Sequence, residues 1–597
     1  MSTGVTRDGG SDGTVELQAT LDYVEAVANS LLAVAEDVLA TKEVDAALRY
    51  IRLAASILSR QNRILTSVKA EALLQRIAAA IDAPATVVGL PPKRKGCLHV
   101  LTEALPAGGL TAMVRRWIQN DTSGRIHRAA LLNQSVAVPD AFRAVVERTG
   151  GEVYVANAAD GASAKAGWLR TLSTEIADHV ALHIDVSDVI CGAAFGRDGG
   201  PPVMLVNHSA HIFWIGATIA DVTLNCRGSR LEGVWAETYR GIRRHAILPI
   251  PLHDTAVPSN RCDVATRAAA RKRFDIPDGA IIIITVGAEF KYRPCNGLDF
   301  LETCAQAMSS IPEAILIAIG PNEDEYWRAA AAKVGGRIRA LGVRDQQGIA
   351  DLHASADIYV EGFPFGTTTA LLEAASKGIP ALLAPGTCPP PFGTDGIALD
   401  DTMTRPASVE QFAGALNLLC RSGEARAALG ASLQCAVNDH HVGDGWRRHL
   451  ADVMRSLPSQ HAVNMRSEPR ATPPSVHEYW SRFVIQHGLG YRGILEDSIY
   501  ESLARGHKFQ ISSAVTASRR KLRNRSLQRI PFGLLQMLCN HLFALLPARS
   551  AWLIFRTTNY LFRSTWLLRL MRAFGHAEPQ PAGAASWYQE YRSEQTR

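Results

Sequence analysis

Apolar positions near the start of the chain recur at three- and four-residue steps, and no proline interrupts them between residues 15 and 82. This spacing gathers apolar side chains on one face of a helix. Comparable runs follow at residues 46–58 and 68–81. We therefore expect an N-terminal helical domain over residues 1–83, which serves in packing or in forming a homo-oligomer. Its first apolar stripe consists of Leu17, Leu21, Val24, Val27, Leu31 and Val34.

The pattern changes after residues 84–95, a basic segment with three prolines that we interpret as a linker. Short apolar runs now alternate with helical segments, which favours a parallel sheet covered by helices. These runs predict strands at residues 97–102, 128–132, 152–155, 180–184, 203–206 and 222–224. We expect an N-terminal Rossmann-like lobe over residues 96–255.

A second alternating series follows a proline-containing boundary and a basic helix at residues 265–274. Its predicted strands are 281–286, 314–319, 338–341, 358–360 and 381–383. Four consecutive isoleucines at 281–284 are typical of a central strand buried on both faces. The series predicts a C-terminal Rossmann-like lobe over residues 256–460, facing the first across a cleft. The fold class is thus α/β, and such sheets bind ligands beyond the carboxyl ends of their strands.

The composition is that of a globular protein, with 47% hydrophobic and 20% charged residues. The 10 cysteines are scattered and form no Cys-x-x-Cys pair, which argues against a zinc ribbon and favours a reducing compartment. Residues 1–13 contain no apolar signal core, so we expect a cytoplasmic protein. The segment around Gly108 and Gly109 is not the Gly-x-Gly-x-x-Gly fingerprint of dehydrogenases, and the chain contains no phosphate loop of P-loop nucleotidases.

Two segments of the first lobe carry candidate chemistry. Gly108 and Gly109 lie between a predicted strand and a helix, where backbone amides can approach a phosphate; a plain turn is the alternative. His208 and His211 follow directly after another predicted strand. A histidine there can hold a sugar hydroxyl or take its proton, and we favour His211 for that role. Their spacing would also suit a metal, but no third ligand is near in sequence, so we expect none.

The second lobe offers cations and hydrogen-bond donors. Lys291 and Arg293 follow the isoleucine-rich strand and are placed to neutralise a diphosphate. Glu373 lies about one helical turn into a later helix, where its carboxylate can accept hydrogen bonds from ribose hydroxyls. The structural alternatives are a solvated turn, a helix cap and a helix surface. The start of that helix forms a candidate anion site of Gly366, Thr367, Thr368 and Thr369.

From residue 97 to residue 449 the sequence resembles GT-B glycosyltransferases of the broad group-1 kind. The segment from Phe365 to Glu373, with Lys377-Gly-Ile-Pro380 after it, is similar to the family's nucleotide-sugar segment. The resemblance implies that Glu373 binds the ribose and that the threonine-rich backbone holds the diphosphate. It further implies a cationic clamp at Lys291 and Arg293, a glycine loop at Gly108 and Gly109, a base-framing loop at Gly342 and Val343, and an acceptor side at His208 and His211.

One position departs from the family pattern. Retaining members carry a glutamate eight residues before the ribose glutamate, where this chain has Phe365, and the nearest acid is Glu361. The string Phe363-Pro-Phe-Gly366 with its three threonines instead resembles O-linked N-acetylglucosamine transferases and their bacterial N-glycosylating relatives. Those enzymes modify proteins and also place a helical domain ahead of the two lobes.

The resemblance implies a hexosyl- or N-acetylhexosaminyltransferase. Its donor would be a nucleoside-diphosphate sugar, with UDP favoured over GDP, and its acceptor a hydroxyl of a glycan or lipid-linked molecule. No cofactor and no metal is expected. The alternatives are a protein-modifying transferase, a catalytically inactive GT-B scaffold and a sugar-nucleotide epimerase of the same fold.

The end of the chain has its own charge. Residues 502–577 contain 13 lysines and arginines and no acidic residue. The remaining chain therefore holds 50 basic and 57 acidic residues, a balance of −7 against the total of +6. We predict a basic, amphipathic helical region over residues 461–597. Polar residues interrupt its apolar runs, which disfavours a membrane-spanning helix. We expect residues 519–574 to bind an anionic membrane at its inner face, with packing on the lobes as the alternative and no nucleic-acid partner.

Overall fold

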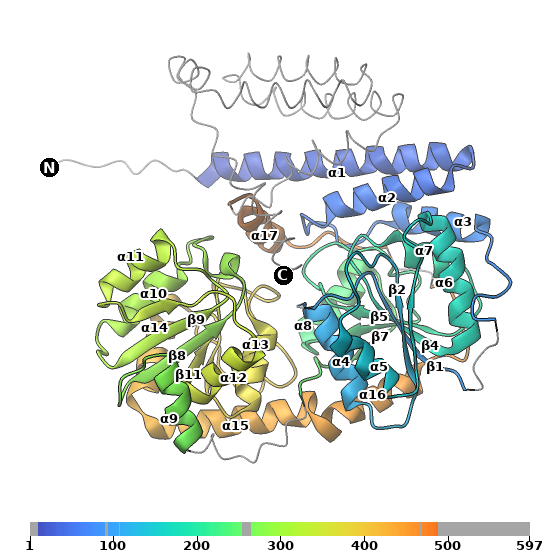
Figure 1. The fold of residues 1–597 in the computed structure, drawn as a ribbon. Helices are drawn as coiled ribbons and strands as arrows, with labels where there is room; N and C mark the ends of the chain where they lie inside the picture. The colour runs from blue at the N-terminus through green and yellow to red at the C-terminus, as the bar shows by residue number, and fades with distance from the viewer. Residues whose placement is uncertain (1–9, 90–93, 107, 254–263, 465–467, 487–597) are drawn as a thin grey trace, which may run out of the picture.

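The computed structural model describes residues 10–89, 94–106, 108–253, 264–464 and 468–486 (Figure 1). Three helices precede the first sheet, as the apolar spacing predicts: α1 (Gly10–Ala40), α2 (Val44–Leu58) and α3 (Val68–Ala80). None of the helices in these ranges combines the length and the hydrophobicity that crossing a bilayer requires. Residues 487–597, and with them the predicted membrane-binding stretch 519–574, lie outside the described part of the chain.

The first sheet has seven parallel strands in the order β3-β2-β1-β4-β5-β6-β7. The strands are β1 (Gly96–Leu101), β2 (His127–Leu131), β3 (Val153–Val155), β4 (Ala177–His183), β5 (Val203–Asn207), β6 (Val222–Asn225) and β7 (His245–Ile247). The helices between them are α4 (Gly109–Asn120), α5 (Asp140–Glu147), α6 (Ala162–Ile176), α7 (Val189–Phe195) and α8 (Arg230–Val234).

One face of this sheet shares its core with the N-terminal helices. Leu98 and Val100 of β1 belong to the same buried cluster as Leu31 of α1 and Ile51 of α2. The carboxylate of Glu71 in α3 accepts hydrogen bonds from the backbone of residues 216–218, at 2.8 to 3.3 Å. The helical segment is therefore built into the first lobe and covers one face of its sheet.

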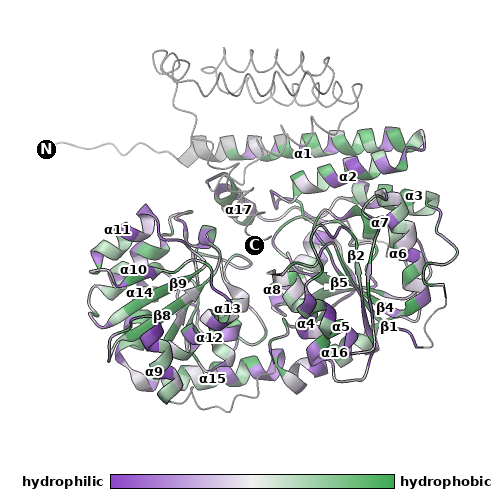
Figure 2. Ribbon diagram, in the orientation of Figure 1, coloured by the Kyte–Doolittle hydropathy of each residue, from purple (hydrophilic) through white to green (hydrophobic). Residues whose placement is uncertain are grey.

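The second sheet has five parallel strands in the order β10-β9-β8-β11-β12. Figure 2 shows hydrophobic residues along its central strands β8 and β9. The strands are β8 (Ile281–Val286), β9 (Ala314–Ile319), β10 (Ile338–Ala340), β11 (Ile358–Val360) and β12 (Ala381–Leu382). Its helices are α9 (Val264–Arg273), α10 (Phe300–Met308), α11 (Glu325–Lys333), α12 (Gln346–Ser355), α13 (Thr368–Ser376) and α14 (Val409–Arg421).

Residues 281–284 of β8 are all isoleucine, and the packing of the strand explains this run. Ile283 packs into a cluster with α10, α11 and α14, whereas Ile282 and Ile284 pack into another with α12, α13 and α15 (Gly423–His441). Both faces of the strand are buried, so alternate residues meet different helices and all must be apolar.

The last helices connect the lobes. Helix α16 (Gly443–Ser456) packs on the first sheet through Trp446, whose ring centroid lies 5.9 Å from that of Trp117 in α4. It falls within the range that we assigned to the second lobe from the sequence. Helix α17 (Pro474–Gln486) packs on the second lobe, where the Tyr479 hydroxyl donates to the Pro364 carbonyl at 2.7 Å.

The α/β class with two Rossmann-like sheets is confirmed, and every segment predicted as a strand forms one. The extra strand is β7, which the sequence did not predict. It is three residues long, lies at the sheet edge and begins with His245, so no apolar run marks it.

Candidate active site

Helix α13 begins where the loop after β11 ends, at the carboxyl edge of the second sheet. Thr367 takes the position before its first turn, but its hydroxyl is 2.7 Å from the Tyr359 hydroxyl and does not cap the helix. The Thr368 hydroxyl lies 2.8 Å from that of Thr394, and Thr369 is exposed. The first-turn amides of α13 thus lack a side-chain cap from Thr367, and a helix start of this kind favours an anion.

Lys291 reaches this helix start from the loop after β8. It lies in a 3₁₀ turn (Glu289–Tyr292), donates from Nζ to the Gly366 carbonyl at 2.7 Å, and stands 4.9 Å from the ring centroid of Phe365. Burial lowers the pKa of Lys291 to about 8, although the charge of Glu361 opposes the shift. The structure therefore joins the two segments that the sequence offered as a diphosphate site.

Arg293 points elsewhere. Its guanidinium forms ion pairs with Glu289 and Asp324 and lies 5.2 Å over the ring of Tyr326. These two carboxylates hold the pKa of Arg293 above its usual range, although burial opposes them. The positive charge is already balanced by Glu289 of the same loop and by Asp324 at the start of α11, so the structure gives Lys291, and not Arg293, to the start of α13.

Glu373 of α13 forms an ion pair with Arg116 of α4, which belongs to the first lobe. The side chains of both residues are largely buried, with 26% and 13% of their surface exposed. Figure 1 shows α4 and α13 as neighbouring helices of the two lobes. The carboxylate that we expected on a ribose thus holds the lobes together in this structure.

Glycine turns line the neighbouring strand ends of the second sheet. Gly320 has a φ of +110°, and a Cβ there would lie 2.0 Å from the Gly287 carbonyl oxygen, so only glycine fits. Gly320 donates its amide to the Gly342 carbonyl at 2.9 Å, and Gly342 has a φ of +68°. Val343 follows with 71% of its surface exposed. The loop predicted to frame a base is held by backbone contacts and presents an apolar side chain to solvent.

Gly108 and Gly109 begin α4. A Cβ on Gly109 would meet nothing within 4 Å, and one on Gly108 would only touch Leu105 at 3.8 Å. Gly108 has an extended backbone with a φ of 172° and Gly109 is helical, so neither backbone conformation nor internal packing demands glycine at these positions. The space beside this helix start is open, which agrees with a close approach by a ligand and equally with a simple turn.

The two predicted histidines lie in different surroundings. The His211 ring packs against Phe365 and Trp480 of the second lobe and of α17, with ring centroids 5.2 and 5.0 Å away. Burial lowers its pKa to about 3, and the charges of Arg227 and Lys291 add to the shift.

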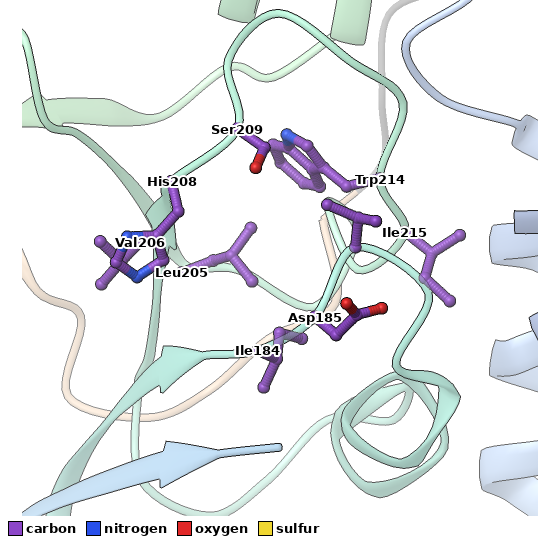
Figure 3. Close-up of a pocket in the computed structure, with 9 residues that line it drawn as sticks. Ile184, Asp185, Leu205, Val206, His208, Ser209, Trp214 and Ile215 are labelled. Atoms are coloured by element: carbon purple, nitrogen blue, oxygen red, sulfur yellow. The ribbon is translucent and has the colours of Figure 1, made fainter. Parts of the chain in front are cut away.

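His208 lines a small pocket at the carboxyl ends of β4 and β5 (Figure 3). Asp185, Ser209 and Trp214 are among its other lining residues. Burial lowers the pKa of His208 to about 3, so the ring is neutral at physiological pH. The pocket lies on the first sheet at the edge where Rossmann-like sheets bind ligands.

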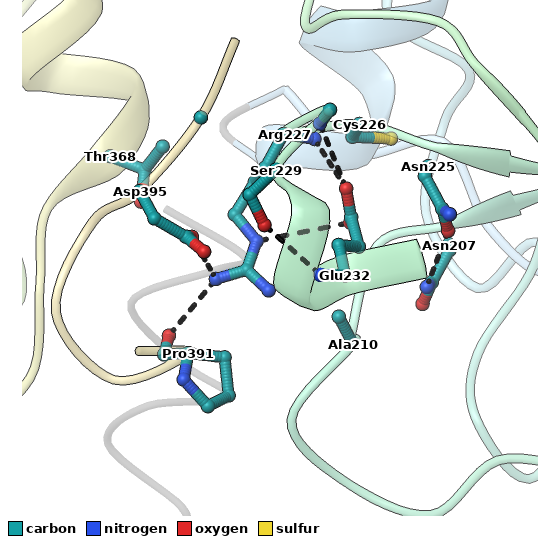
Figure 4. A network of polar contacts seen from close by, with 12 residues as sticks. Asn207, Ala210, Asn225, Cys226, Arg227, Ser229, Glu232, Thr368, Pro391 and Asp395 are labelled. Carbon is teal, nitrogen blue, oxygen red and sulfur yellow. Dashed lines mark hydrogen bonds and ion pairs between the residues drawn. The ribbon is translucent and has the colours of Figure 1, made fainter. Parts of the chain in front are cut away.

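The sequence interpretation missed Arg227, which lies two positions after the end of β6. It contacts Asp395 at 2.7 Å and the Pro391 carbonyl at 3.3 Å, both in the second lobe, beside Thr368 (Figure 4). The rule that chemistry gathers at strand ends could have found this residue, because Asn225 ends the strand two positions earlier.

Glu361, the acid nearest to the family's missing glutamate, has a structural role. It is fully buried, and its two oxygens accept from the backbone amides of Ala384 and Thr394 at 2.7 Å each. A Cβ on Gly366 would lie 2.2 Å from this carboxylate. Glu361 therefore fixes the conformation of the loop before α13 through buried hydrogen bonds.

One group of side chains in the described residues has the composition of a metal site. Cys97, His99 and His127 are buried on the first sheet, with one potential ligand atom of each within 4.8 Å of the others. The group lies inside the lobe and is separate from the start of α13.

No family model matches the chain, and no curated protein matches its sequence. Similar solved structures include HepE of Anabaena in complex with UDP and glucose, at 15% identity and a TM-score of 0.45, covering 61% of this chain and 100% of that one. An O-GlcNAc transferase of Thermobaculum terrenum is 13% identical over 72% and 83% of the chains, with a TM-score of 0.44. A glycosyltransferase of Rickettsia africae is 11% identical over 60% and 98%, with a TM-score of 0.46.

These likenesses concern the fold alone. The chain has the two Rossmann-like lobes of the GT-B architecture, with an N-terminal helical segment built onto the first lobe.

Proposed function

We propose that this protein is a glycosyltransferase that moves a sugar from a UDP-sugar to a hydroxyl of a glycan, lipid-linked or protein acceptor. The observation that carries the proposal is the contact of Lys291 with the Gly366 carbonyl, which puts a cation at the start of α13. A diphosphate is bound well where a cation and unpaired backbone amides converge. Both segments follow strands at the carboxyl edge of their sheet, where ligands of this fold bind.

In the proposed reaction the acceptor oxygen bonds to the anomeric carbon as the bond from that carbon to the diphosphate oxygen breaks. Lys291 and the first-turn amides of α13 stabilise the charge that develops on the leaving diphosphate, a term of several kcal/mol in comparable sites. A histidine of the loop after β5, His211 or His208, takes the acceptor proton. These groups supply the positive charge that a metal would otherwise bring, so we propose a metal-independent reaction.

Donor binding requires a rearrangement between the lobes. Arg116 occupies Oε1 of Glu373 in this structure, so a ribose that binds through that oxygen needs Arg116 to move away. The exposed Val343 would contact the nucleotide base from the side. Lobe movement then both admits the donor and excludes water from the reaction.

The first test is thermal unfolding of the full chain with UDP, GDP and ADP. Specific binding raises the midpoint by mass action, and we expect UDP to give the largest shift. In UDP-sugar hydrolysis assays, Glu373→Ala should weaken donor binding, and Lys291→Ala should mainly lower turnover. Lys333→Ala removes an exposed lysine of α11 and is the control. Equal and negligible effects of the two site variants would contradict the site.

A catalytically inactive scaffold is the second candidate. The Thr367 hydroxyl and the Glu373 carboxylate are both engaged by other side chains, and Phe365 replaces the acid of retaining enzymes. A scaffold would bind UDP without hydrolysing or transferring any sugar from a panel of nucleotide sugars, whereas an epimerase would invert the sugar.

A further inference from the structure

Four histidines form a continuous line of ring contacts on one face of the first sheet. Nε2 of His208 lies 3.3 Å from Nδ1 of His183, and Nε2 of His183 lies 3.3 Å from Nδ1 of His99. Nε2 of His99 lies 2.9 Å from Nδ1 of His127. The line joins β5, β4, β1 and β2, and it runs from the pocket into the interior of the lobe.

The line ends on a carboxylate. Nε2 of His127 lies 3.2 Å from Oδ2 of Asp121, a contact that is electrostatic because the ring N–H is not aligned for a hydrogen bond. Burial opposes the ionised form of Asp121, but its contact with His127, a hydrogen bond from Ser123 and the charge of Arg125 lower its pKa. Asp121 is therefore an anion that can only accept.

This ending fixes the tautomer of every ring. Burial lowers the pKa of His99 and His183 well below the usual value, so these rings are neutral, with one N–H and one lone pair each. Asp121 requires the proton of His127 on Nε2, which leaves Nδ1 to accept from Nε2–H of His99. The same alternation continues to His183. The opposite set of tautomers would turn a lone pair of His127 toward the carboxylate.

We propose that this line of imidazoles makes His208 the base of the reaction, with His183, His99 and His127 as positioning residues that carry its proton inward. The alternation places the N–H of His208, a residue that lines the pocket, on Nε2 and leaves its Nδ1 lone pair for an acceptor hydroxyl. In the described residues no hydrogen bond engages this Nδ1. The inference rests on the proposed glycosyl transfer and names the group that takes the proton.

His211 is the less suitable base. Its ring is enclosed by aromatic side chains, and nearby cations, among them Arg227, Lys291 and Arg240, oppose a further positive charge. A proton taken by His208 can instead be passed along the line of histidines toward the Asp121 carboxylate. Its departure from the ring that received it removes the cost of a buried imidazolium at the pocket.

The proton transfer is balanced by three hops. The acceptor O–H gives its proton to Nδ1 of His208, whose Nε2 proton passes to Nδ1 of His183. The Nε2 proton of His183 passes to Nδ1 of His99, and that of His99 to Nδ1 of His127. His127 then carries protons on both nitrogens and forms an ion pair with Asp121, while the other three rings are neutral in the reversed tautomer.

Several neighbouring groups face this line. Cys97 lies with its Sγ 3.6 Å from Nε2 of His99, and His179 stands on the same face of β4. Arg125 pairs with Asp121 at the inner end. Trp117 of α4 covers His99 and His183, with ring centroids 5.3 and 5.6 Å away. A metal ion on Cys97, His99 and His127 is the rival use of this geometry, since it would need the proton of His99 on Nδ1 instead.

The tautomers can be read without any activity. We expect long-range ¹H–¹⁵N correlations of the histidine-labelled full chain to show His183 and His208 as neutral rings protonated on Nε2, assigned with His183→Gln and His208→Gln. Asp121→Asn should weaken this preference. An Nδ1–H tautomer of His208, or metal retained by the purified protein in a one-to-one ratio, would overturn the proposal.

The relay is tested by kinetics with UDP-glucose hydrolysis as the probe. We expect His208→Gln to lower kcat by about 100-fold and His183→Gln by about tenfold at nearly constant KM, as for loss of general base catalysis. His179→Gln is the matched control: it lies on the same strand and face, and its Nε2 has no hydrogen-bond partner in the described residues. Glutamine at position 183 keeps hydrogen bonding but cannot pass a proton.

The isotope dependence separates a relay from a packing effect. In mixtures of light and heavy water, the rate of the unsubstituted protein should curve with deuterium content because several protons move, and that of His183→Gln should be linear. Equal kcat losses in His179→Gln and His183→Gln, or a linear dependence in the unsubstituted protein, would refute the relay. If no UDP-sugar is hydrolysed, the proposed function fails, while the tautomer of His208 remains measurable.

Discussion

At the scale of single residues, the candidate site contains one lysine, Lys291, whose burial disfavours its charged form. Lys291 is held between the Gly366 carbonyl and the Phe365 ring, and burial lowers its pKa to about 8. Among the residues that the structure describes, the Gly366 carbonyl is the one hydrogen-bond acceptor of the protonated form. A diphosphate would give it a full countercharge, so the residue is poised to bind an anion.

This pKa gives a dependence of UDP affinity on pH. Below pH 8 we expect Lys291 to be charged and to bind the diphosphate. Above pH 8 Lys291 must take up a proton when UDP binds, so the affinity for UDP should fall by at most about tenfold per pH unit. Calorimetric titration with UDP between pH 7 and 9.5 measures the slope. Lys291→Met should bind weakly with a flat profile, and Lys333→Met should keep the original one. An affinity that rises with pH would contradict the role.

The residues also show how far sequence reasoning reaches. Lys291 and Gly366 follow adjacent parallel strands, so their meeting could be predicted from topology alone. The ion pair of Arg293 with Asp324 could not be predicted, because Asp324 stands 31 positions away at the start of α11, where an acidic residue is expected as a helix cap in any case. The ion pair of Arg116 with Glu373 could not be predicted either, because the two residues are 257 positions apart and lie in different lobes.

At the scale of elements, that pair couples helices α4 and α13 across the lobes. The pair is largely buried, so each partner loses solvation and depends on the other. A ribose that binds through Oε1 of Glu373 must displace Arg116, and the affinity of the donor is then reduced by the free energy of that contact.

Removing Arg116 should therefore strengthen donor binding. We expect Arg116→Met to tighten UDP binding by about fivefold, the lower end of common coupling between sites. In a Glu373→Gln background the same change should have no effect, which a double-mutant cycle measures. Arg115→Met removes a neighbouring charge of the same helix and is the control. A loss of UDP affinity in Arg116→Met would show that Arg116 itself binds the nucleotide.

Strands were the elements that the sequence predicted best. Buried parallel strands are continuous apolar runs, and each of those runs lies within the sheets. No comparable apolar run predicts that α16 packs on the first sheet, with Trp446 against Trp117. This contact joins segments that are far apart in the chain. The apolar face of an amphipathic helix shows that the helix packs on something, but not on which sheet.

Helix α3 is fastened to the first lobe by Glu71, and this attachment has a measurable strength. Glu71→Gln replaces an acceptor oxygen with a donor that faces backbone N–H groups of residues 216–218, at a cost of about 1–3 kcal/mol. We expect the thermal midpoint to fall by several degrees. Glu36→Gln, in an exposed ion pair with Arg76, should change it little. Equal midpoints for the two variants would argue against the attachment.

At the scale of the whole molecule, charge is divided between the part that the structure describes and the part beyond it. Residues 502–577 carry 13 basic and no acidic residues, while the balance elsewhere is −7. The candidate donor site lies in the acidic part, so the basic stretch is not needed for a diphosphate. A separate anionic partner is the simplest use of such a charge, and a lipid surface suits its aromatic and aliphatic residues.

The full chain should accordingly bind vesicles that contain phosphatidylserine and not vesicles of phosphatidylcholine alone. Each basic residue near an anionic surface contributes about 1 kcal/mol, so changing Arg519, Arg520 and Lys521 to glutamine should weaken flotation strongly, and high salt should release the protein. The matched control changes Arg447, Arg448 and Arg455 of α16 to glutamine and should float as before. Equal binding to both vesicle types, or a preference for nucleic acid over vesicles, would refute the lipid assignment and leave the donor site untouched.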